Sequence, residues 1–365
     1  MKKEIFIHPG APIKEALKRL DKTAEKTLLV VDRNKRLLGT LTDGDIRRYI
    51  IRTGKLIGTI KNIYNKNPIA IRKSNLSKEK IKKIFLKERI EVLPIVDETG
   101  KVVDYMTWDQ VFSEQKKFWL HQGRKINVPV VIMAGGRGTR LAPFTYVLPK
   151  PLIPVGEKTI VEHIIDGFRA FGVKKFFLTL NYRGEMIEAY FNGIKKDYEI
   201  EFIWENDFLG TAGSLKLLEG KIEEDFIVSN CDILIRADFS EILNFHRNNQ
   251  AAFTSITAIQ HYKIPYGVVN VRNGGMIESI EEKPEYTFQI NTGVYVLNKS
   301  ILNFIPENQY FDMPDLIKKL LNKGKKVLAY PVNESDYVDV GQWEDYKRAL
   351  NKIGGIRKCI KERKY

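Results

Sequence analysis

Hydrophobic and polar positions follow two different patterns along the chain. In the first third, short apolar runs lead through turn residues into a second apolar run, with helical spacing on both sides. From Val128 onward, runs of β-branched and aromatic residues alternate with segments whose apolar positions repeat at helical spacing. Strands that alternate with helices are typical of a parallel sheet joined by crossover helices. The pattern therefore predicts two parts with different folds.

The first part contains an internal repeat. Two apolar runs, 28–32 and 93–97, each end in Asp and are followed by a second run that ends at Thr42 or Thr107, an offset of 65 residues without a gap. Each copy reads helix, strand, turn, strand, helix, with expected helices over 13–20, 45–52, 81–90 and 109–117. One such unit cannot cover its own sheet, so we expect the two copies to form one module.

The second part predicts a single α/β domain with a mostly parallel sheet. Its expected strands are 128–133, 175–180, 201–204, 226–229, 251–259, 268–271, 291–297 and 327–330. Its expected helices are 160–171, 185–191, 211–218, 239–248, 313–322 and 342–350. A polar linker between the two patterns places the domains at 1–122 and 126–365.

The net charge says less about partners than its size suggests. The 60 Lys and Arg outnumber the 45 Asp and Glu by 15, but residues 1–124 carry +13, residues 125–350 carry −3 and the tail carries +5. Nucleic-acid binding would have to rest on the first third and the tail. There the run Lys78–Lys83 reads as a solvated helix face without aromatic stacking residues, so we do not expect nucleic acid as a partner.

Targeting and redox signals are sparse. No apolar run approaches the ~20 residues of a membrane span, and the start of the chain lacks a signal-peptide core. Cys231 and Cys359 show no spacing typical of a disulfide framework or a zinc site, so both are expected to be reduced thiols. These features predict a cytoplasmic protein.

The strongest chemical signal is a glycine-rich loop at the end of the first strand of the second part. The segment 133–141 reads Met-Ala-Gly-Gly-Arg-Gly-Thr-Arg-Leu, and Lys150-Pro151-Leu152 follows. Three glycines within four residues let backbone N–H groups approach phosphate oxygens. The loop lacks the third glycine of a dinucleotide fingerprint and the Gly-Lys-Ser/Thr end of a P-loop. It therefore predicts a phosphate cradle of another kind.

The stretch from this loop to Val155 resembles the signature of the sugar-1-phosphate nucleotidylyltransferases. The resemblance implies a Rossmann-like sheet and places the nucleotide at Ala134, Gly135, Gly136, Gly138 and Thr139. It implies that Arg140 and Lys150 bind the triphosphate and the sugar phosphate. By the same resemblance, Asp232 and Asp339 are the carboxylates for Mg²⁺. As an alternative, each could be a strand-end Asp that caps the next helix.

Such a reaction needs no general base. A sugar 1-phosphate is already an oxyanion and attacks the α-phosphorus of a nucleoside triphosphate in line, so positioning and charge neutralisation are what the site must supply. The five histidines form no catalytic motif and are expected to be packing or surface residues.

Two further groups match the same family. The segment 209–215, Leu-Gly-Thr-Ala-Gly-Ser-Leu, resembles the segment that reads the base, through Gly210 and Thr211, and its wording is closest to the guanylyltransferase branch. The thymidylyltransferases usually carry Asp-Gly-Leu-Ala there. The residues that match the sugar side of the family are Gly267, Glu282, Lys283, Asn291 and Thr292.

The repeat resembles a tandem of cystathionine-β-synthase (CBS) domains. In that family the Thr and the Asp three residues on hold an adenine nucleotide, which implies Thr42 and Asp45. The second copy departs from the pattern, with Asp104 in place of Gly39 and Gln110 in place of Asp45. At most one good nucleotide site is expected.

Together these features predict a CBS pair joined to an enzyme that makes an NDP-sugar, with GTP as the favoured nucleotide and Mg²⁺ as cofactor. Mannose, heptose and glucosamine 1-phosphates, from surface-glycan pathways, are the candidate sugars, and a homo-oligomer is expected. The alternatives are a thymidylyl-, cytidylyl- or uridylyltransferase and a non-catalytic protein that senses nucleotides through its CBS sites.

Overall fold

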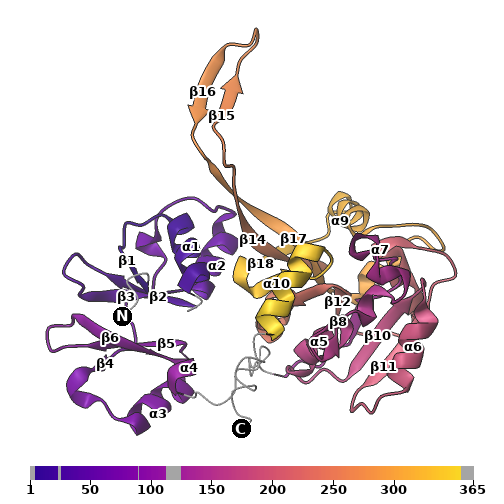
Figure 1. Ribbon diagram of the computed structural model, residues 1–365, viewed down its shortest axis with the longest axis horizontal. Helices are drawn as coiled ribbons and strands as arrows, with labels where there is room; N and C mark the ends of the chain where they lie inside the picture. The colour runs from indigo at the N-terminus through magenta and orange to yellow at the C-terminus, as the bar shows by residue number, and fades with distance from the viewer. Residues whose placement is uncertain (1–4, 24–25, 89, 112–124, 355–365) are drawn as a thin grey trace. The chain divides into compact units, whose positions relative to one another are not determined.

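The computed structural model describes residues 5–23, 26–88, 90–111 and 125–354 (Figure 1). The chain divides into two compact units: Met1–Lys116 with Ala258–Ile290 and Asn333–Ser335, and Lys117–Thr257 with Asn291–Val332 and Asp336–Tyr365. The segment Ala258–Ile290, here called the arm, thus groups with the N-terminal part. The predicted domain boundary near 122–126 lies largely outside the described residues and stays a prediction.

The first unit contains two copies of the same small fold. Each has a three-stranded sheet in which the first two strands pair in parallel and the last two form an antiparallel hairpin. The strands are β1 (Phe6–Ile7), β2 (Thr27–Val31), β3 (Leu37–Thr42), β4 (Ile71–Arg72), β5 (Val92–Val96) and β6 (Val102–Thr107). The hairpin register pairs Thr27 with Thr42 and Val92 with Thr107, which is the same pair shifted by the predicted offset.

Helices lie on both sides of each hairpin in the sequence, as the pattern predicts. They are α1 (Ile13–Thr23), α2 (Asp43–Thr53), α3 (Lys78–Glu88) and α4 (Trp108–Val111). The buried positions of α1 recur at helical spacing, Ile13, Ala16, Leu17 and Leu20, because one face packs on the sheet. Most of the expected helix over 109–117 lies outside the described residues.

The arm completes the core of the first repeat. Ile259 is 3 % exposed and belongs to the same hydrophobic cluster as Ile13, Leu17 and Leu28. Lys14 donates to the backbone carbonyl of Glu285, and Lys18 forms an ion pair with the Glu285 carboxylate. The arm therefore docks on α1 through one apolar anchor and one group of charged contacts.

The second unit is built on a seven-stranded sheet in the order β11-β10-β7-β12-β17-β14-β18. Strands β7, β10, β11 and β12 are parallel to one another, and β17 runs antiparallel to β12. The bounds are β7 (Val130–Met133), β10 (Lys175–Leu180), β11 (Glu199–Trp204), β12 (Phe226–Asn230), β14 (Phe253–Lys263), β17 (Glu285–Leu297) and β18 (Val327–Asn333). This parallel-rich α/β sheet confirms the predicted fold class.

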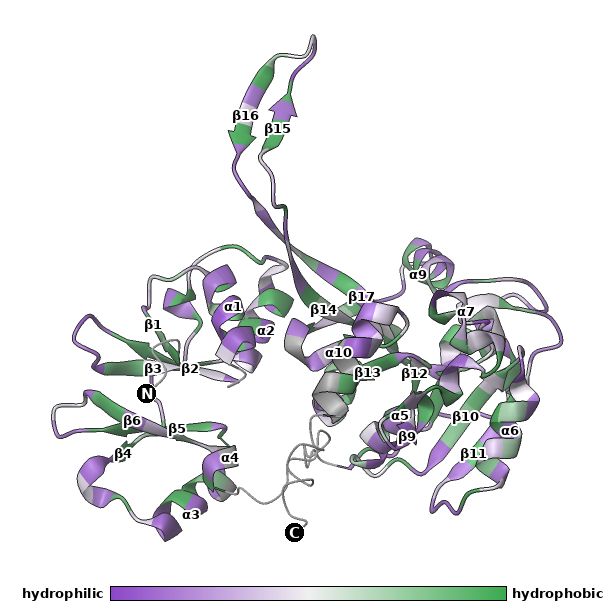
Figure 2. Ribbon diagram, viewed as in Figure 1, coloured by the Kyte–Doolittle hydropathy of each residue, from purple (hydrophilic) through white to green (hydrophobic). Residues whose placement is uncertain are grey.

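Six helices of this unit match the predicted ones. They are α5 (Ile160–Arg169), α6 (Gly184–Asn192), α7 (Gly210–Gly213), α8 (Phe239–Asn248), α9 (Met313–Asn322) and α10 (Trp343–Gly354). The strands β10 and β12 are largely hydrophobic and the helices alternate between hydrophobic and hydrophilic positions (Figure 2), as expected where helices cover a sheet. The predicted helix over 211–218 begins at Gly210 and changes to a 3₁₀ helix at Ser214.

Several short strands were not predicted. They are β8 (Pro154–Val155), β9 (Lys158–Thr159), β13 (Ile233–Ile235), β16 (Ile277–Glu281) and β19 (Tyr337–Asp339). Strands β15 (Val268–Val271) and β16 pair in the arm. Apart from β16, these segments have only two or three residues and carry no readable period, so pairing with a partner elsewhere in the chain defines them. Within the described residues, no helix combines the length and the apolar character that a membrane span requires.

We expect Ile259→Ala to lower the free energy of unfolding by about 2 to 5 kcal/mol, because it leaves a cavity in the core of the first repeat. Chemical denaturation of the full chain, followed by circular dichroism, measures this loss. Val269→Ala is the matched control, since Val269 is a branched residue of the same arm but is 47 % exposed. Equal stability of the two variants would contradict the docking of the arm on this core.

Candidate active site

The site lies at the carboxyl edge of the parallel strands. β7 and β12 are neighbours in parallel register, with Met133 opposite Asn230. The glycine-rich loop follows β7 and Asp232 follows β12, so the sheet itself brings the two segments together. This edge is where open α/β sheets bind their ligands.

Two glycines of the loop are required by close packing. Gly138 has φ +64°, and a Cβ there would lie 2.8 Å from the Cβ of Lys150. A Cβ at Gly135 would lie 2.8 Å from Oε1 of Glu205. Gly136, in contrast, faces open space, with no atom within 4 Å of its Cβ position. The loop is therefore packed on two sides and accessible at Gly136, as a phosphate cradle would need to be.

Lys150 and Asp232 form a buried ion pair under the loop. The Lys150 ammonium donates to Oδ2 of Asp232, and the two side chains are only 9 % and 7 % exposed. The Arg140 guanidinium lies 3.9 Å from the same oxygen, but its side chain is 61 % exposed. The structure thus gathers three of the predicted residues at one point, with Lys150 buried and Arg140 open to solvent.

Asp339 is brought to this point by the short strand pair. β13 and β19 are antiparallel and pair Ile233 with Asp339, and the Val340 N–H donates to the Asp232 carbonyl at 2.8 Å. The Gly341 N–H donates to Oδ1 of Asp339 at 2.6 Å. Burial, and then the neighbouring Asp232 carboxylate, raises the pKa of Asp339 above its ordinary value. A buried carboxylate whose charge is opposed by a second carboxylate is suited to a cation.

Gly341 shows how closely these charged groups converge. A Cβ on Gly341 would lie 2.5 Å from Oδ2 of Asp232, 2.8 Å from Oδ1 of Asp339 and 2.9 Å from Nζ of Lys150. Among the described residues, no cluster of three or more metal-ligating side chains is present. A pair of carboxylates is nevertheless the usual protein contribution to an Mg²⁺ site that is completed by phosphates and water. The donor set therefore fits Mg²⁺ bound together with a nucleotide.

The C-terminal helix holds the segment that carries Lys150. Nε1 of Trp343 donates to the Ala142 carbonyl at 3.0 Å, and the Tyr346 hydroxyl donates to the Pro154 carbonyl at 2.8 Å. The Trp343 ring also packs on Phe144, with centroids 5.0 Å apart. These contacts fix both ends of the stretch between the loop and β8. Nothing in the local sequence around Trp343 indicates this role, since its partner lies about 200 residues away.

A second group of residues surrounds the predicted base-reading segment. Gly210 has φ +78°, and its Cβ would lie 2.8 Å from the Phe311 carbonyl oxygen. Glu205, which follows β11, is 7 % exposed, and its Oε2 accepts a hydrogen bond from the Leu209 N–H at 3.2 Å. Burial raises the pKa of Glu205. Sequence reasoning missed Glu205, although its place at the end of a strand could have drawn attention to it.

The predicted sugar-side residues fall in both compact units. Asn291 and Thr292 belong to the second unit, where Oδ1 of Asn291 accepts from the Ser255 hydroxyl and the Thr292 hydroxyl donates to the Ile256 carbonyl. Gly267, Glu282 and Lys283 belong to the arm. A Cβ on Gly267 would lie 3.1 Å from Oε2 of Glu282, so these two residues are neighbours. Their predicted role in sugar binding stays a prediction.

Thr42 and Asp45 form a capping box at the start of α2. The Asp45 carboxylate accepts from the Thr42 N–H at 2.8 Å, and the Thr42 hydroxyl accepts from the Asp45 N–H at 3.2 Å. In the second copy Thr107 and Gln110 make the same two hydrogen bonds. Helix capping thus explains the repeated pattern in both copies, and nucleotide binding at Thr42 and Asp45 stays a prediction.

The remaining candidates for acid–base or nucleophilic chemistry belong to the scaffold. Nε2 of His163 donates to the Val155 carbonyl at 2.8 Å, and Nδ1 of His246 lies 2.8 Å from the Thr254 hydroxyl. Burial raises the pKa of Cys231 to about 12, so its thiol stays protonated. Cys359 and His121 lie outside the described residues. These environments agree with a reaction that needs no side-chain base or nucleophile.

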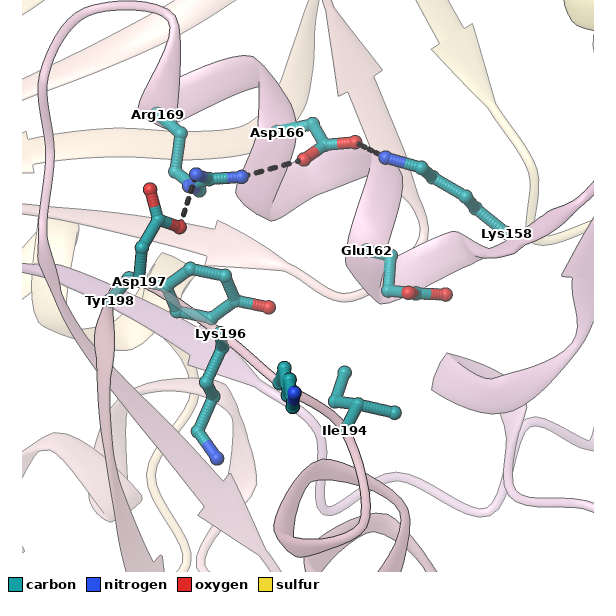
Figure 3. A pocket seen from close by; sticks show the side chains of 9 residues that line it. Lys158, Glu162, Asp166, Arg169, Ile194, Lys196, Asp197 and Tyr198 are labelled. Atoms are coloured by element: carbon teal, nitrogen blue, oxygen red, sulfur yellow. Dashed lines mark hydrogen bonds and ion pairs between the residues drawn. The ribbon is translucent and has the colours of Figure 1, made fainter.

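A separate hollow of about 480 Å³ lies over α5, lined also by residues 194–198 (Figure 3). Its charges neutralise one another. Asp166 pairs with Lys158 and with Arg169, and Arg169 also pairs with Asp197. Because three acids stand against four bases in its lining, the hollow lacks the concentrated positive charge that a polyphosphate would need.

Comparison with known proteins identifies the family. The family model for nucleotidyl transferases matches residues 129–354, and the CBS domain model matches residues 1–52. The chain therefore belongs to the nucleotidyl transferase family and carries an N-terminal CBS domain.

Named relatives match about three fifths of the chain. A UTP–glucose-1-phosphate uridylyltransferase from Synechocystis is 31 % identical over 61 % of this chain, and a mannose-1-phosphate guanyltransferase from Candida albicans is 34 % identical over 59 %. Both matches span 62 % of the relative's own length. The crystal structure of HddC from Yersinia pseudotuberculosis aligns with a TM-score of 0.48 and 27 % identity, over 62 % of this chain and 99 % of that one.

We expect Gly341→Ala to impair the site while leaving the fold intact, because the added methyl group must displace the ends of Asp232, Asp339 or Lys150. The concentration of Mg²⁺ needed for half-maximal turnover should rise about tenfold or more, which corresponds to about 1.4 kcal/mol. Gly193→Ala, where φ is −83° and the Cβ makes ordinary contacts at 3.5 and 3.6 Å, controls for the loss of a glycine. An unchanged Mg²⁺ requirement in Gly341→Ala would show that these groups do not bind the cation.

Proposed function

We propose that this protein transfers a nucleotidyl group, most specifically GMP, from a nucleoside triphosphate to a sugar 1-phosphate and releases pyrophosphate. The observation that carries the proposal is the convergence of Arg140, Lys150, Asp232 and Asp339 at the carboxyl edge of the sheet beside a glycine-rich loop. Membership of the nucleotidyl transferase family supports the reaction class. A protein that only bound nucleotides would have no need for two converging carboxylates.

The residues divide the work between positioning and charge neutralisation. The loop N–H groups around Gly136 would hold phosphate oxygens, and exposed Arg140 would reach the triphosphate. Lys150 fits under the loop because Gly138 has no side chain, and its ammonium pairs with Asp232. It would contact the phosphate that reacts. The sugar phosphate oxygen forms the new bond to the α-phosphorus as the bond to pyrophosphate breaks, so no proton has to be removed from the nucleophile.

The carboxylates Asp232 and Asp339 would hold Mg²⁺, which neutralises charge on the triphosphate when it is bound. Until then the Lys150 ammonium balances the buried Asp232 carboxylate. Further parts of the proposal are an adenine nucleotide at Thr42 and Asp45, a homo-oligomer and a cytoplasmic location.

The wild-type protein should release pyrophosphate from one nucleoside triphosphate when the correct sugar 1-phosphate is present. A panel of GTP, UTP, CTP, dTTP and ATP against mannose, glucose, glucosamine and heptose 1-phosphates, with mass spectrometry of the product, identifies the pair. Tight nucleotide binding without turnover by any pair would contradict the enzyme and favour the sensing alternative.

Substitution of the site residues should lower this turnover. Asp232→Ala and Lys150→Ala should lose most turnover, and Arg140→Ala should cost on the order of 3 kcal/mol in transition-state stabilisation. Lys221→Ala is the control, since its side chain is exposed and pairs with Glu201 away from the loop. Normal rates in Asp232→Ala at saturating Mg²⁺ would refute the metal assignment.

The proposed preference for guanine rests on Glu205 as well as on the sequence of the base-reading segment 209–215. Glu205 lies between Gly135 and Leu209, so it joins the phosphate loop to the base loop. A carboxylate only accepts hydrogen bonds when ionised, whereas a Gln amide also donates. The Watson–Crick edge of guanine presents two adjacent donors, N1–H and N2–H₂, which suit a carboxylate. The uracil edge instead combines one donor with two acceptors.

We expect Glu205→Gln to lower the ratio of kcat/KM for GTP to kcat/KM for UTP at least tenfold, because an amide donor would then face the guanine donors. Gln keeps an oxygen for the Leu209 N–H, so the loop should stay in place. The two kcat/KM values, measured at saturating sugar 1-phosphate, give this ratio. Glu201→Gln, on β11 with a side chain that is 39 % exposed, is the control, and an unchanged ratio in Glu205→Gln would remove Glu205 from base selection.

A further inference from the structure

Thr211 and Asp312 cap each other's helices across 101 residues of sequence. Oδ1 of Asp312 accepts hydrogen bonds from the N–H and the hydroxyl of Thr211, both at 2.9 Å. In return the Thr211 hydroxyl accepts from the Met313 N–H, the first N–H of α9, also at 2.9 Å. Asp312 occupies the N-cap position of α9 but makes no side-chain cap to its own helix. Its carboxylate instead accepts hydrogen bonds from Thr211 of the base-reading segment.

The backbone next to Asp312 is also hydrogen-bonded to the backbone on both sides of Thr211. The Phe311 N–H donates to the Leu209 carbonyl at 2.9 Å, and the Phe311 carbonyl accepts from Ala212 and Gly213 at 2.9 and 2.8 Å. Gly210 is glycine because a side chain there would meet the Phe311 carbonyl. The segment 309–313 thus forms a rigid support against the predicted base-reading segment.

The support is anchored in the core. Met313 is 1 % exposed, and Leu316 and Leu320 of α9 belong to the same hydrophobic cluster as Ala212 and Leu215. Oδ2 of Asp312 is held in turn by the Tyr310 hydroxyl at 2.6 Å. Burial opposes ionisation of Asp312, but the hydrogen bonds from Thr211 and Tyr310 outweigh it and lower the pKa of Asp312. The acceptor is therefore an ionised, oriented carboxylate.

We propose that Asp312 is a positioning residue for nucleotide selection. By holding Thr211, it fixes the segment 209–213 in the conformation that reads the base, without contacting the nucleotide itself. This inference rests on the proposed function. It also changes the predicted role of Thr211. The Thr211 hydroxyl is hydrogen-bonded to Asp312 and Met313, so Thr211 acts on the base through its backbone.

The test separates the acceptor from the size of the side chain. Asp312→Leu keeps the size but removes the acceptor, whereas Asp312→Asn keeps an oxygen for Thr211. We expect Asp312→Leu to raise KM for GTP about tenfold or more and to lower the preference for GTP over UTP, while KM for the sugar 1-phosphate changes less than twofold. Asp312→Asn should restore most of both properties. Asp315→Leu, an exposed Asp one turn further along α9, is the matched control.

A merely structural role would give a different result. It would lower kcat in proportion to the loss of folded protein and leave the GTP to UTP preference unchanged, and that result would overturn the inference. Thr211→Val provides a second variant if Asp312→Leu fails to fold, and it should shift the same preference. Direct GTP binding by calorimetry adds a readout that does not depend on turnover. A wild-type protein with no turnover would contradict the proposed function, whereas an active wild type with unaltered variants would contradict only this inference.

Discussion

The buried ion pair between Lys150 and Asp232 joins two segments 82 residues apart, and the rest of the site is arranged around it. Desolvating two charges is unfavourable unless both are held in place. Here Gly138 leaves room for the stem of Lys150 and Gly341 leaves room for the charged ends. Under the proposed function this pair would be exchanged, with a phosphate taking over the ammonium and a cation taking over the carboxylate. Until then the two buried charges balance each other.

Local patterns were enough to predict most strands of the sheet, its helices and the edge at which Asp232 meets the glycine loop, but the expected strand 268–271 pairs with β16 in the arm instead. Parallel strands of Val, Ile and Phe, each followed by polar residues, place those residues at one edge whatever the details of packing. The same holds for the repeat, where the two hairpins have identical register. By contrast, Gly341, Glu205, Asp312 and Trp343 owe their roles to partners far away in the chain. No local period reports a contact of that kind, so only the folded structure shows it.

The distribution of charge also takes on a physical meaning. The segment 125–350 carries a net −3, whereas the proposed ligands are polyanions, so their affinity would come from a few placed groups and not from a general positive field. The Lys150 side chain is buried and its orientation is fixed by Asp232, whereas the Arg140 side chain is exposed to solvent. Part of the basic excess of the first unit is used internally, since Lys14 and Lys18 both bind Glu285 of the arm.

Two strands, β14 and β17, each have residues in both compact units. Ile259 is buried in the core of that repeat, and β14 continues without a break from Phe253, in the second unit, to Lys263, in the first. β17 makes the same crossing in the return direction. Asn291 and Thr292, whose predicted role is to bind the sugar, lie within β17, directly after the last residue of the arm.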